Sequence, residues 1–521
     1  MSTVIDFTLP EVYNASEILF HNLAAGRGAK VALYYRDQQV TYRQVAEEAN
    51  RVGNLLRSLQ IPPGSRIMLL LLDTPVFPAA FFGAVKAGYV PIITNTSLPS
   101  GDIEYFLTDG DARAVFVDAP LYPKIAAVRA NCPALAHVIV AGGDGQAETI
   151  AYAAAVAAAD PELATYPTQK SDMAYWMYSS GSTGRPKGIV HIQSDLRYSI
   201  ATYAKEIVNF SERDIAYSVP KLFFAYGFGN AMIFPFAVGA SAILDAERPE
   251  PKRIYDNIER YRPTLFFAVP TLYIALVNQP DAAQRDLSSV RFCVSAAESL
   301  PAELYQRWMN YYGLEICEGC GSTEMTHIYI SNRPGHTKAS SAGVTVPGYE
   351  IKLVAPGDDT IEITAPYETG VMMVRGANAA PYYWNRPDKT AHTMRNGWLY
   401  TDDLFYRDED GFYYFTGRAN DIFKVSGQWV SPPEVEATLL LHPAVFESAV
   451  VPFKDEDELN RTKAFVMLKS GYSPSAALIE ELQTFVKSQI APYKYPRYIE
   501  FVADLPRTAT GKILRYQLRQ A

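Results

Sequence analysis

The sequence predicts an α/β protein whose large, multi-lobed N-terminal part holds mostly parallel sheets and a small β-lobe. A small, mobile C-terminal part of mixed α and β structure is expected to follow. Three observations support this. Buried strands alternate with helices through the first half of the chain, short half-buried strands replace them after about residue 345, and a mixed segment follows a polar turn near residue 420. Alternating strands and helices are typical of parallel sheets covered by helices.

The clearest strand–helix–strand unit lies between residues 66 and 93. The apolar run 66–72 is typical of a fully buried strand, and 73–75 resembles a capped helix start with a proline in its first turn. This helix is expected to end at Gly88, directly before a strand at 89–93. The same rhythm predicts further strands at 114–117, 138–141, 241–244, 264–269 and 291–295.

The sequence pattern changes in the last third of the chain. Short strands are expected at 349–354, 360–364 and 370–374, as in a small β-lobe. A strand from 411 ends in the polar turn 417–421, where we place a boundary between domains 1–419 and 420–521. Beyond it, residues 431–434 read Ser-Pro-Pro-Glu, which fits a capping box.

Composition restricts the class of protein. With 521 residues, 48% hydrophobic and 20% charged, the chain is an ordinary globular one. Its net charge of −9 argues against broad binding to nucleic acid or to anionic membranes. Four cysteines suggest a reducing compartment, residues 1–6 show no secretory signal, and no apolar run is long enough to cross a bilayer. We therefore expect a soluble, cytoplasmic protein.

The stretch 178–188 reads Tyr-Ser-Ser-Gly-Ser-Thr-Gly-Arg-Pro-Lys-Gly and follows a strand expected at 174–178. Glycines let backbone N–H groups approach an anion, Ser and Thr donate hydrogen bonds, and Lys187 adds a positive charge. The stretch is not a P-loop, because counting from Gly181 puts Pro186 where the second glycine belongs. A flexible surface loop is the alternative, but the preceding strand and the cations favour a phosphate site.

A second glycine- and hydroxyl-rich turn, residues 320–324, contains the carboxylate of Glu324. Beside a phosphate site, one carboxylate suggests Mg²⁺, although alone the run would indicate a plain turn. Cys317 and Cys320 form a Cys-x-x-Cys pair, but no second pair completes a zinc site. No Gly-x-Ser-x-Gly elbow occurs in the main loop, which argues against a serine hydrolase.

Motifs in a fixed order carry a family resemblance. They are the loop 178–188, the turn 321–324, the run 397–403, the pair 417–418 and the tail 506–512. In order and spacing they resemble the adenylate-forming superfamily of acyl- and aryl-CoA synthetases, luciferases and peptide-synthetase adenylation domains. The resemblance covers essentially the whole chain. It implies that a carboxylate is joined to the α-phosphate of ATP, pyrophosphate leaves, and a thiol then displaces AMP.

The resemblance also implies roles for particular residues. The β- and γ-phosphates would be held by Ser180, Ser182, Thr183 and Lys187. The α-phosphate and Mg²⁺ would be attended by Thr323 and Glu324. The adenine would be flanked by Ala296, Ala297, Glu298, Glu318, Gly319 and Cys320. The ribose hydroxyls would bind Asp403, assisted by Arg418, and Lys512 would reach the α-phosphate and the substrate carboxylate.

The same resemblance implies that the C-terminal domain swings between the two half-reactions. The hinge would be Asn420, where the family more often has Asp or Lys, and Asp402 stands where glycine commonly precedes the ribose-binding Asp. After the swing, Lys424, Ser426, Gly427 and Trp429 would face CoA. Acetylation of Lys512 would remove its charge and switch the enzyme off.

Residues 221–230 and 322–328 resemble the benzoate–CoA ligase branch of the family. This implies an acyl pocket lined by Phe224, Ala225, Tyr226, Gly321, His327 and Ile328. Aromatic side chains with a histidine suit one ring rather than a fatty chain. For Phe223, Phe224 or Phe228 taken singly a plain core role is equally consistent, and His327 alone could be a satisfied structural histidine.

We therefore expect a ligase of aromatic acid degradation that couples benzoate or a close analogue to coenzyme A, with ATP and Mg²⁺, through an acyl-adenylate. Hydroxybenzoate, aminobenzoate, a heteroaromatic acid and cyclohexanecarboxylate stay open as substrates, and a carrier-protein thiol stays open as the acceptor. A nucleotide-binding regulatory protein without turnover is the alternative from another class. A homodimer is expected, and neither nucleic acid nor a membrane is an expected partner.

Overall fold

The computed structural model describes residues 5, 7–143, 147–179, 185–419, 421, 423–425, 428–455, 459–507 and 513–519. The described residues fall into two compact units. The first unit holds those up to residue 351 together with 374–399, and the second holds 352–373 together with those from 400 onward. Each unit is described below by itself. The predicted domain boundary at residue 420 stays a prediction.

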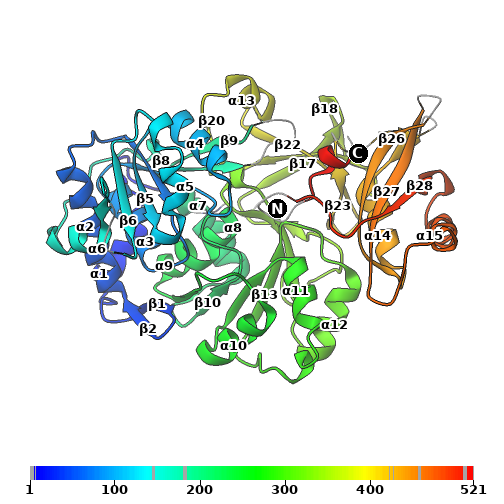
Figure 1. Cartoon of the computed structure of the whole chain (residues 1–521), viewed down its shortest axis with the longest axis horizontal. Coiled ribbons are helices and arrows are strands. Elements are labelled where there is room, and N and C mark those ends of the chain that lie inside the picture. The colour runs from blue at the N-terminus through cyan, green and yellow to red at the C-terminus, as the bar shows by residue number, and fades with distance from the viewer. Residues whose placement is uncertain are drawn as a thin grey trace. The chain divides into compact units, whose positions relative to one another are not determined.

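One sheet of the first unit has the strand order β20-β9-β8-β4-β3-β5-β6-β7 (Figure 1). The strands are β3 (Arg66–Leu70), β4 (Val90–Ile93), β5 (Ala112–Asp118), β6 (His137–Ala141), β7 (Ile150–Ala151), β8 (Met173–Ser179), β9 (Lys187–Ile192) and β20 (Tyr382–Tyr383). All neighbours from β8 to β7 are parallel, whereas β9 runs antiparallel to both β8 and β20. Helices α2 (Tyr42–Ser58), α3 (Val76–Lys86), α4 (Ser100–Asp109), α5 (Tyr122–Ala126) and α6 (Tyr152–Ala158) connect or follow these strands.

The other sheet of the first unit has the order β16-β15-β14-β13-β12-β10-β11-β1-β2. Its strands are β1 (Val31–Tyr35), β2 (Gln38–Thr41), β10 (Ile215–Ser218), β11 (Ser241–Leu244), β12 (Leu265–Ala268), β13 (Phe292–Ala296), β14 (Ile316–Gly321), β15 (Ile328–Ser331) and β16 (Val344–Thr345). The strands from β14 to β1 are parallel. One face packs on α10 (Pro251–Tyr261), α11 (Pro270–Val277) and α12 (Ala302–Tyr312), which lie together along this sheet in Figure 1. The remaining helices of the unit are α1 (Glu17–Ala24), α7 (Asp195–Ser199), α8 (Ala225–Phe228), α9 (Phe234–Val238) and α13 (Pro387–Thr393).

The second unit is built mainly from antiparallel pairings, and its strand 498–501 pairs in parallel with strand 460–468. Its strands include β18 (Asp358–Ile363), β23 (Tyr413–Arg418), β24 (Phe423–Val425), β25 (Gln428–Val430), β26 (Val445–Lys454), β27 (Asn460–Leu468) and β28 (Tyr498–Phe501). Strands β17 (Glu350–Ala355), β19 (Gly370–Arg375) and β22 (Trp398–Arg407) span the two units, and β21 (Met394–Arg395) lies in the first. Helices α14 (Pro432–Leu440) and α15 (Ala476–Gln489) close a core against β26 and β27, and α16 (Arg515–Leu518) follows.

The predicted α/β fold with mostly parallel sheets is confirmed, and the strands expected at 66–72, 89–93 and 241–244 are present as β3, β4 and β11. Two local predictions are wrong. The Asp73 carboxylate caps no helix but accepts the backbone N–H of Leu222. The Ser431 hydroxyl does not cap α14, because it donates to the carbonyl of Thr416 instead. In both places a distant backbone group replaces the local partner.

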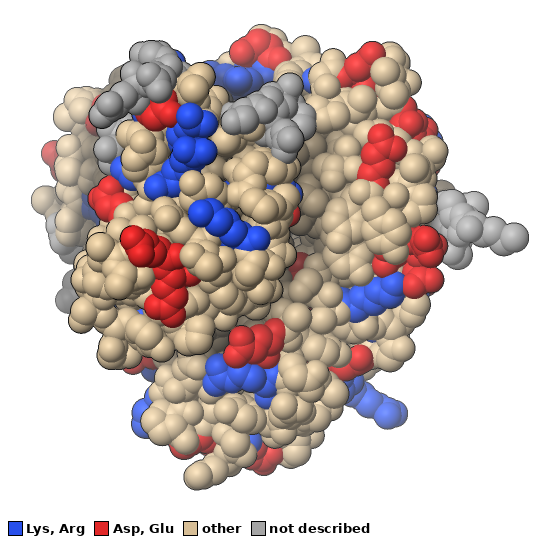
Figure 2. Space-filling model, turned by 90° about the vertical axis from the view of Figure 1, so that its right-hand side faces the viewer, with Lys and Arg blue, Asp and Glu red and all other residues tan. Residues whose placement is uncertain are grey.

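Within the described part of the chain, no helix combines the length and the apolar character that crossing a membrane requires. On the face shown in Figure 2, Lys and Arg side chains are interspersed with Asp and Glu rather than gathered into one continuous field. This mixed pattern is what a chain with 47 basic and 56 acidic residues leads one to expect.

Candidate active site

A tight turn at residues 322–327 joins the ends of the antiparallel strands β14 and β15, whose register pairs Gly321 with Ile328. At its centre, Thr326 has φ of 65° and ψ of −43°, and the His327 N–H donates to the carbonyl of Met325 at 2.6 Å. These features define a γ-turn, a strained conformation that persists only where its surroundings impose it. The γ-turn separates Glu324 on one side from His327 on the other.

The surroundings of this turn fix its backbone. Three groups from outside the turn each donate a hydrogen bond to one of three successive turn carbonyls: His191 to Thr323 at 2.8 Å, the Ala380 N–H to Glu324 at 2.8 Å, and Asn378 to Met325 at 2.7 Å. Inside the turn, the Ser322 hydroxyl accepts the N–H of Met325 at 3.3 Å. Buried carbonyls are costly to leave unpaired, so these bonds hold the turn in one geometry.

The Glu324 carboxylate lies in a short chain of polar contacts with Lys187 and Tyr383. The Lys187 ammonium donates to the Tyr383 hydroxyl at 2.7 Å, and that hydroxyl donates to Glu324 Oε1 at 2.8 Å. Lys187 also lies 3.4 Å from Glu324 Oε1. Burial alone would raise the pKa of Glu324, but the charge of Lys187 and the hydrogen bonds outweigh it, so the pKa lies below its ordinary value. Glu324 is therefore a partly buried anion beside a cation.

Lys187 is placed by a β-hairpin. Strands β8 and β9 pair antiparallel, with Ser179 opposite Lys187. The predicted strand before the phosphate loop is confirmed, and a second strand, rather than the helix of a P-loop, follows it. The predicted phosphate ligands Ser180, Ser182 and Thr183 lie outside the described residues.

The predicted adenine-flanking residues come from the carboxyl ends of two neighbouring parallel strands. The register of β13 and β14 pairs Ser295 with Glu318 and Ala296 with Gly319. Directly after β13, Ala297 has φ of 79°, an uncommon conformation for a residue with a side chain. In open parallel sheets, ligands bind outside such strand ends. The sequence thus brings Ala296, Ala297 and Glu318 to one edge.

Glu318 is buried at this edge, where its carboxyl accepts the backbone N–H of Leu300 at 3.2 Å. Burial raises the pKa of Glu318 to about 8. Its carboxyl group is therefore protonated at neutral pH, when it can donate a hydrogen bond as well as accept one.

Glu318→Gln is expected to stabilise the protein in alkaline solution. The pKa of Glu318 is raised from 4.5 to about 8, so its contribution to stability is complete below pH 4.5 and is lost as the pH rises through about 8. Glutamine removes this loss, on the order of a few kcal/mol. Melting temperatures measured from pH 4 to 9 should coincide at the acid end, diverge progressively in favour of the variant between pH 4.5 and 8, and differ by a constant amount above that. A pH-independent difference would contradict the assignment.

On the other side of the γ-turn, His327 lies among aromatic rings. Its ring centroid is 5.0 Å from that of Tyr203, 5.7 Å from Tyr226 and 4.7 Å from Phe234. Burial lowers the pKa of His327 to about 3, against the effect of its hydrogen bond with the Tyr226 carbonyl, so the ring is neutral. Because Nε2 donates to that carbonyl at 3.3 Å, Nδ1 is a buried acceptor with no partner among the described residues.

Two glycines allow the backbone to approach His327 closely. A Cβ at Gly321 would lie 2.5 Å from the His327 carbonyl oxygen, and one at Gly229 would lie 2.5 Å from the His327 ring. Any side chain at either position would therefore displace the histidine. The predicted pocket residues Phe224, Ala225 and Tyr226 lie at the start of α8, the helix that supplies the carbonyl bound by His327. Ile328 follows the turn as the first residue of β15.

In the second unit, Asp403 and Arg418 lie opposite each other on β22 and β23, and Arg418 Nε is 3.0 Å from Asp403 Oδ1. The preceding residue, Asp402, has φ of 59°. This left-handed conformation costs glycine nothing and is tolerated by Asp better than by most residues. Asp402 can therefore adopt the left-handed backbone conformation that glycine would adopt there, and the position of Asp403 does not depend on a glycine before it.

Several predicted residues fall outside the described part of the chain: Asn420, Ser426, Gly427 and Lys512. Lys424 and Trp429 lie on β24 and β25. The segment after Lys512 is well anchored, because the Arg515 guanidinium contacts both carboxylate oxygens of Glu436, at 2.9 and 2.7 Å.

Sequence reasoning missed Tyr383, His191 and Asn378. Each meets the turn across a large separation, 59 residues between Tyr383 and Glu324 and 132 between His191 and Thr323. The signal available was only a tyrosine pair at 382–383 and a lone histidine on a strand. The Cys-x-x-Cys pair lies on β14 without a disulfide between its two cysteines, and no cluster of His, Cys, Asp or Glu among the described residues is arranged as a metal site.

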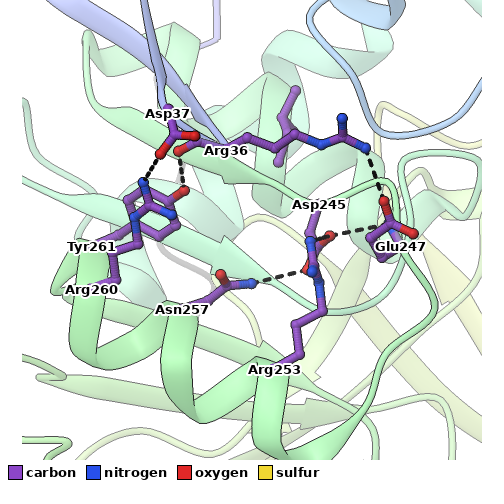
Figure 3. Close-up of a pocket in the computed structure, with 9 residues that line it drawn as sticks. Arg36, Asp37, Asp245, Glu247, Arg253, Asn257, Arg260 and Tyr261 are labelled. Atoms are coloured by element: carbon purple, nitrogen blue, oxygen red, sulfur yellow. Dashed lines mark hydrogen bonds and ion pairs between the residues drawn. The ribbon is translucent and has the colours of Figure 1, made fainter.

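Figure 3 shows a pocket of about 290 Å³ in the first unit, at the ends of β1 and β11 and beside α10. No predicted site residue lines it. Its three arginines are each paired with a carboxylate: Arg36 with Glu247 at 2.9 Å, Arg253 with Asp245 at 2.7 Å and Arg260 with Asp37 at 2.6 Å. These lining residues are charge-compensated, so the pocket is not a second phosphate site.

An anionic glutamate beside a lysine on a β-hairpin, in a turn that follows the parallel strand β14, is the arrangement expected of an enzyme that handles the phosphates of a nucleotide. The chain belongs to the AMP-binding enzyme family: the family model of that description matches residues 20–384, and the model described as the AMP-binding enzyme C-terminal domain matches residues 434–512. The predicted membership of the adenylate-forming superfamily is thereby confirmed.

Particular relatives are similar over almost the whole chain. A benzoate–CoA ligase of Thauera aromatica is 45% identical over 515 residues, which cover 98% of this chain and 97% of that protein. The crystal structure of the anthranilate CoA ligase AuaEII in complex with anthranoyl-AMP is 41% identical with a TM-score of 0.92, covering 98% of both chains. A benzoate CoA ligase from Burkholderia xenovorans LB400 is 40% identical with a TM-score of 0.89, covering 98% of this chain and 100% of that one.

Proposed function

We propose that this protein is an AMP-forming ligase that joins a small aromatic carboxylic acid, benzoate or a close analogue, to coenzyme A through an acyl-adenylate. One observation carries the proposal. The tight turn at 322–327 has an anionic Glu324 beside Lys187 on one side of its γ-turn and a neutral His327 among aromatic rings on the other. A single turn thus joins a phosphate-handling half to a ring-binding half. The near-full-length similarity to benzoate and anthranilate CoA ligases supports the same substrate class.

In the first half-reaction, a carboxylate oxygen of the acid attacks the α-phosphorus of ATP, the bond to the β-phosphate oxygen breaks, and pyrophosphate leaves. The reacting groups are all anions, so cations and hydrogen-bond donors must offset their charge. We assign the β- and γ-phosphates to Lys187 with Ser180, Ser182 and Thr183, and the α-phosphate to Thr323. The hydrogen bond from the Lys187 ammonium to the Tyr383 hydroxyl holds this cation in place.

Mg²⁺ fits this site. The ion prefers one or two carboxylates together with phosphate oxygens and water, and Glu324 supplies one partly buried carboxylate that stays ionised. When bound, Mg²⁺ offsets the charge of the phosphate oxygens. The part of this chain is to keep Glu324 anionic and fixed, through Lys187, Tyr383 and the bonds to the turn carbonyls.

In the second half-reaction, the CoA thiol attacks the acyl carbon, the thiol proton is lost, the carbon–oxygen bond to AMP breaks, and AMP leaves with that oxygen. We assign the ribose hydroxyls to Asp403, which Arg418 holds in place at 3.0 Å. Ala296, Ala297 and Glu298 with Glu318, Gly319 and Cys320 would flank the adenine. The C-terminal domain would rotate about Asn420 between the two half-reactions. This rotation would move Lys512 away from the active site and bring in the face that carries Lys424, Ser426, Gly427 and Trp429.

AMP release tests the proposal. The purified protein is incubated with MgATP, CoA and one acid at a time from a panel of benzoate, hydroxy- and aminobenzoates, a heteroaromatic acid and cyclohexanecarboxylate. We expect AMP to form in step with an aryl-CoA thioester, and only when both the acid and CoA are present. AMP formation with a carrier protein but not with CoA would overturn the choice of acceptor. ATP binding without acid-dependent pyrophosphate exchange would overturn the enzyme assignment itself.

A substituted ring acid is the second candidate substrate. The observation that favours it is the buried Nδ1 of His327, an acceptor without a partner among the described residues. A hydroxyl or amino group on the ring would satisfy it by donating a hydrogen bond. In the acid panel, a kcat/KM for an amino- or hydroxybenzoate above that for benzoate would select this candidate.

Three further features belong to the proposal: a cytoplasmic location, a homodimer, and regulation by acetylation of Lys512. Acetylation would remove the positive charge that the crowded anions of adenylation require. Full adenylating activity of a sample fully acetylated at Lys512 would refute this regulation.

A further inference from the structure

A buried pair of side chains, His191 and Asp195, lies directly behind the γ-turn, and no role in the chemistry has been given to it. His191 is on β9, the strand that begins with Lys187, and Asp195 is the first residue of α7. The exposed fractions of their side chains are 1% and 0%. His191 Nδ1 lies 2.9 Å from Asp195 Oδ2, and Nε2 lies 2.8 Å from the carbonyl oxygen of Thr323.

The chemistry of the partners fixes the direction of these bonds. A carbonyl oxygen only accepts, so His191 Nε2 must carry a hydrogen and donate it to Thr323. Asp195 Oδ2 already accepts the backbone N–H of Ile192 at 3.1 Å, which orients the carboxylate toward the ring. The hydrogen between Nδ1 and Oδ2 then holds the imidazole with Nε2 aimed at the turn, as an acid partner does for a histidine in many active sites.

Packing restricts the ring further. His191 stacks on Tyr175 with a centroid distance of 5.0 Å and an interplanar angle of 18°. Tyr175 and His191 are opposite each other in the β8–β9 register. The imidazole is thus locked by a stacked ring, by Asp195 and by the carbonyl it binds, and it cannot rotate away from Thr323 without breaking all three contacts.

The bond from His191 affects the position of Thr323 and Glu324, the two residues of the turn that are assigned to the phosphates and Mg²⁺. Thr323 and Glu324 face the phosphates in the proposed function, and the next residues form the strained γ-turn that ends at His327. We propose that His191, oriented by Asp195, is a positioning residue: its hydrogen bond to the Thr323 carbonyl sets the place of the Thr323–Glu324 segment for binding MgATP. One strand, β9, thereby positions both the cation Lys187 and the anion Glu324. The inference rests on the proposed function for its catalytic readout only.

The first test compares two replacements of His191. His191→Phe keeps a ring stacked on Tyr175 but has no donor, whereas His191→Gln places an amide N–H near the position of Nε2. We expect His191→Phe to weaken binding of a non-hydrolysable MgATP analogue, measured by calorimetry, and to lower the kcat of acid-dependent pyrophosphate exchange, each about 10- to 100-fold. KM for the acid should change little. His191→Gln should recover most of both losses. Equal losses in the two variants, or none in His191→Phe, would overturn the proposal.

A second pair of variants decides the question if His191→Phe does not fold. Asp195→Asn can still donate an amide hydrogen to Nδ1 and keep Nε2 aimed at Thr323, although it gives up the bond from the Ile192 N–H, whereas Asp195→Leu can do neither. In Asp195→Asn, the affinity for the analogue and kcat should stay within about threefold of wild type. In Asp195→Leu, both should fall about 10- to 100-fold. Similar values in the two Asp195 variants would overturn the role of the carboxylate as the orienting group.

The matched control is His442→Asn in the second unit. His442 is also a buried histidine with a carboxylate partner, Glu481 at 3.2 Å, and it has no bond to the turn. This variant should keep wild-type affinity and rate. If wild type itself supports no acid-dependent exchange with any ring acid, the proposed function fails, while the calorimetric comparison of the His191 variants still tests the positioning role.

Discussion

Glu324→Gln is expected to lower the rate of acid-dependent ATP–pyrophosphate exchange by about 100- to 1,000-fold, since one charge-stabilising contact in a transition state is worth that much. Glutamine keeps the shape and the bond from Tyr383 but loses the negative charge that faces Lys187 at 3.4 Å and would meet Mg²⁺. The exchange rate, measured at saturating acid and over a range of Mg²⁺ concentrations, gives the loss and shows whether more Mg²⁺ offsets it.

Glu48→Gln is the matched control for this prediction. Glu48 is also a partly buried glutamate that accepts a hydrogen bond from a tyrosine, Tyr152, at 2.6 Å, but it lies on α2 with no predicted ligand. Its exchange rate should equal that of wild type. A Glu324→Gln enzyme as fast as wild type, or an equal loss in Glu48→Gln, would remove Glu324 from the site.

Lys512→Ala is expected to raise the barrier to adenylation by about 3 kcal/mol, which lowers the rate of that half-reaction more than 100-fold. The rate of transfer from a preformed acyl-adenylate to CoA should change much less. The reason is charge: the first half-reaction brings a carboxylate against a phosphate, and the second uses a thiol on a less crowded carbon. The two half-reactions are measured separately, by pyrophosphate exchange and by AMP release from synthetic benzoyl-AMP with CoA.

The control for Lys512 is Lys487→Ala, which removes another cation near the C-terminus. Lys487 lies on α15, and its ammonium is 3.9 Å from the centre of the Tyr495 ring. It should leave both half-reactions unchanged. Equal losses in the two half-reactions of Lys512→Ala would contradict the assignment of Lys512 to the adenylating arrangement alone.

Local sequence pattern was sufficient for most of the fold. Continuous apolar runs such as 66–72 predicted β3, and Gly88 marked the end of the helix before β4, because burial period and glycine conformation are local properties. Where a distant backbone group competes for a polar side chain, local prediction was wrong. Asp73 and Ser431 looked like helix caps but bind Leu222 and Thr416 instead.

The candidate site divides in the same way. Lys187, Glu324 and His327 were found because each sits in a run of unusual composition, and the structure places Lys187 and Glu324 together. Their supports were not found. Tyr383 and His191 lie in unremarkable stretches and act through contacts across the fold, which no spacing rule reports. The backbone of Asp402 was equally hidden, since its left-handed φ of 59° explains the departure from glycine only once the structure is known.

The central claim is that the acid is activated by bonding one of its own carboxylate oxygens to the phosphorus of AMP. The most direct test uses benzoate, or the best acid of the panel, labelled with ¹⁸O in both carboxylate oxygens, together with MgATP and CoA. Mass spectrometry of the products should find one ¹⁸O in AMP and the other in the thioester. Unlabelled AMP, or ADP and labelled phosphate in its place, would contradict the acyl-adenylate and with it this account of the site.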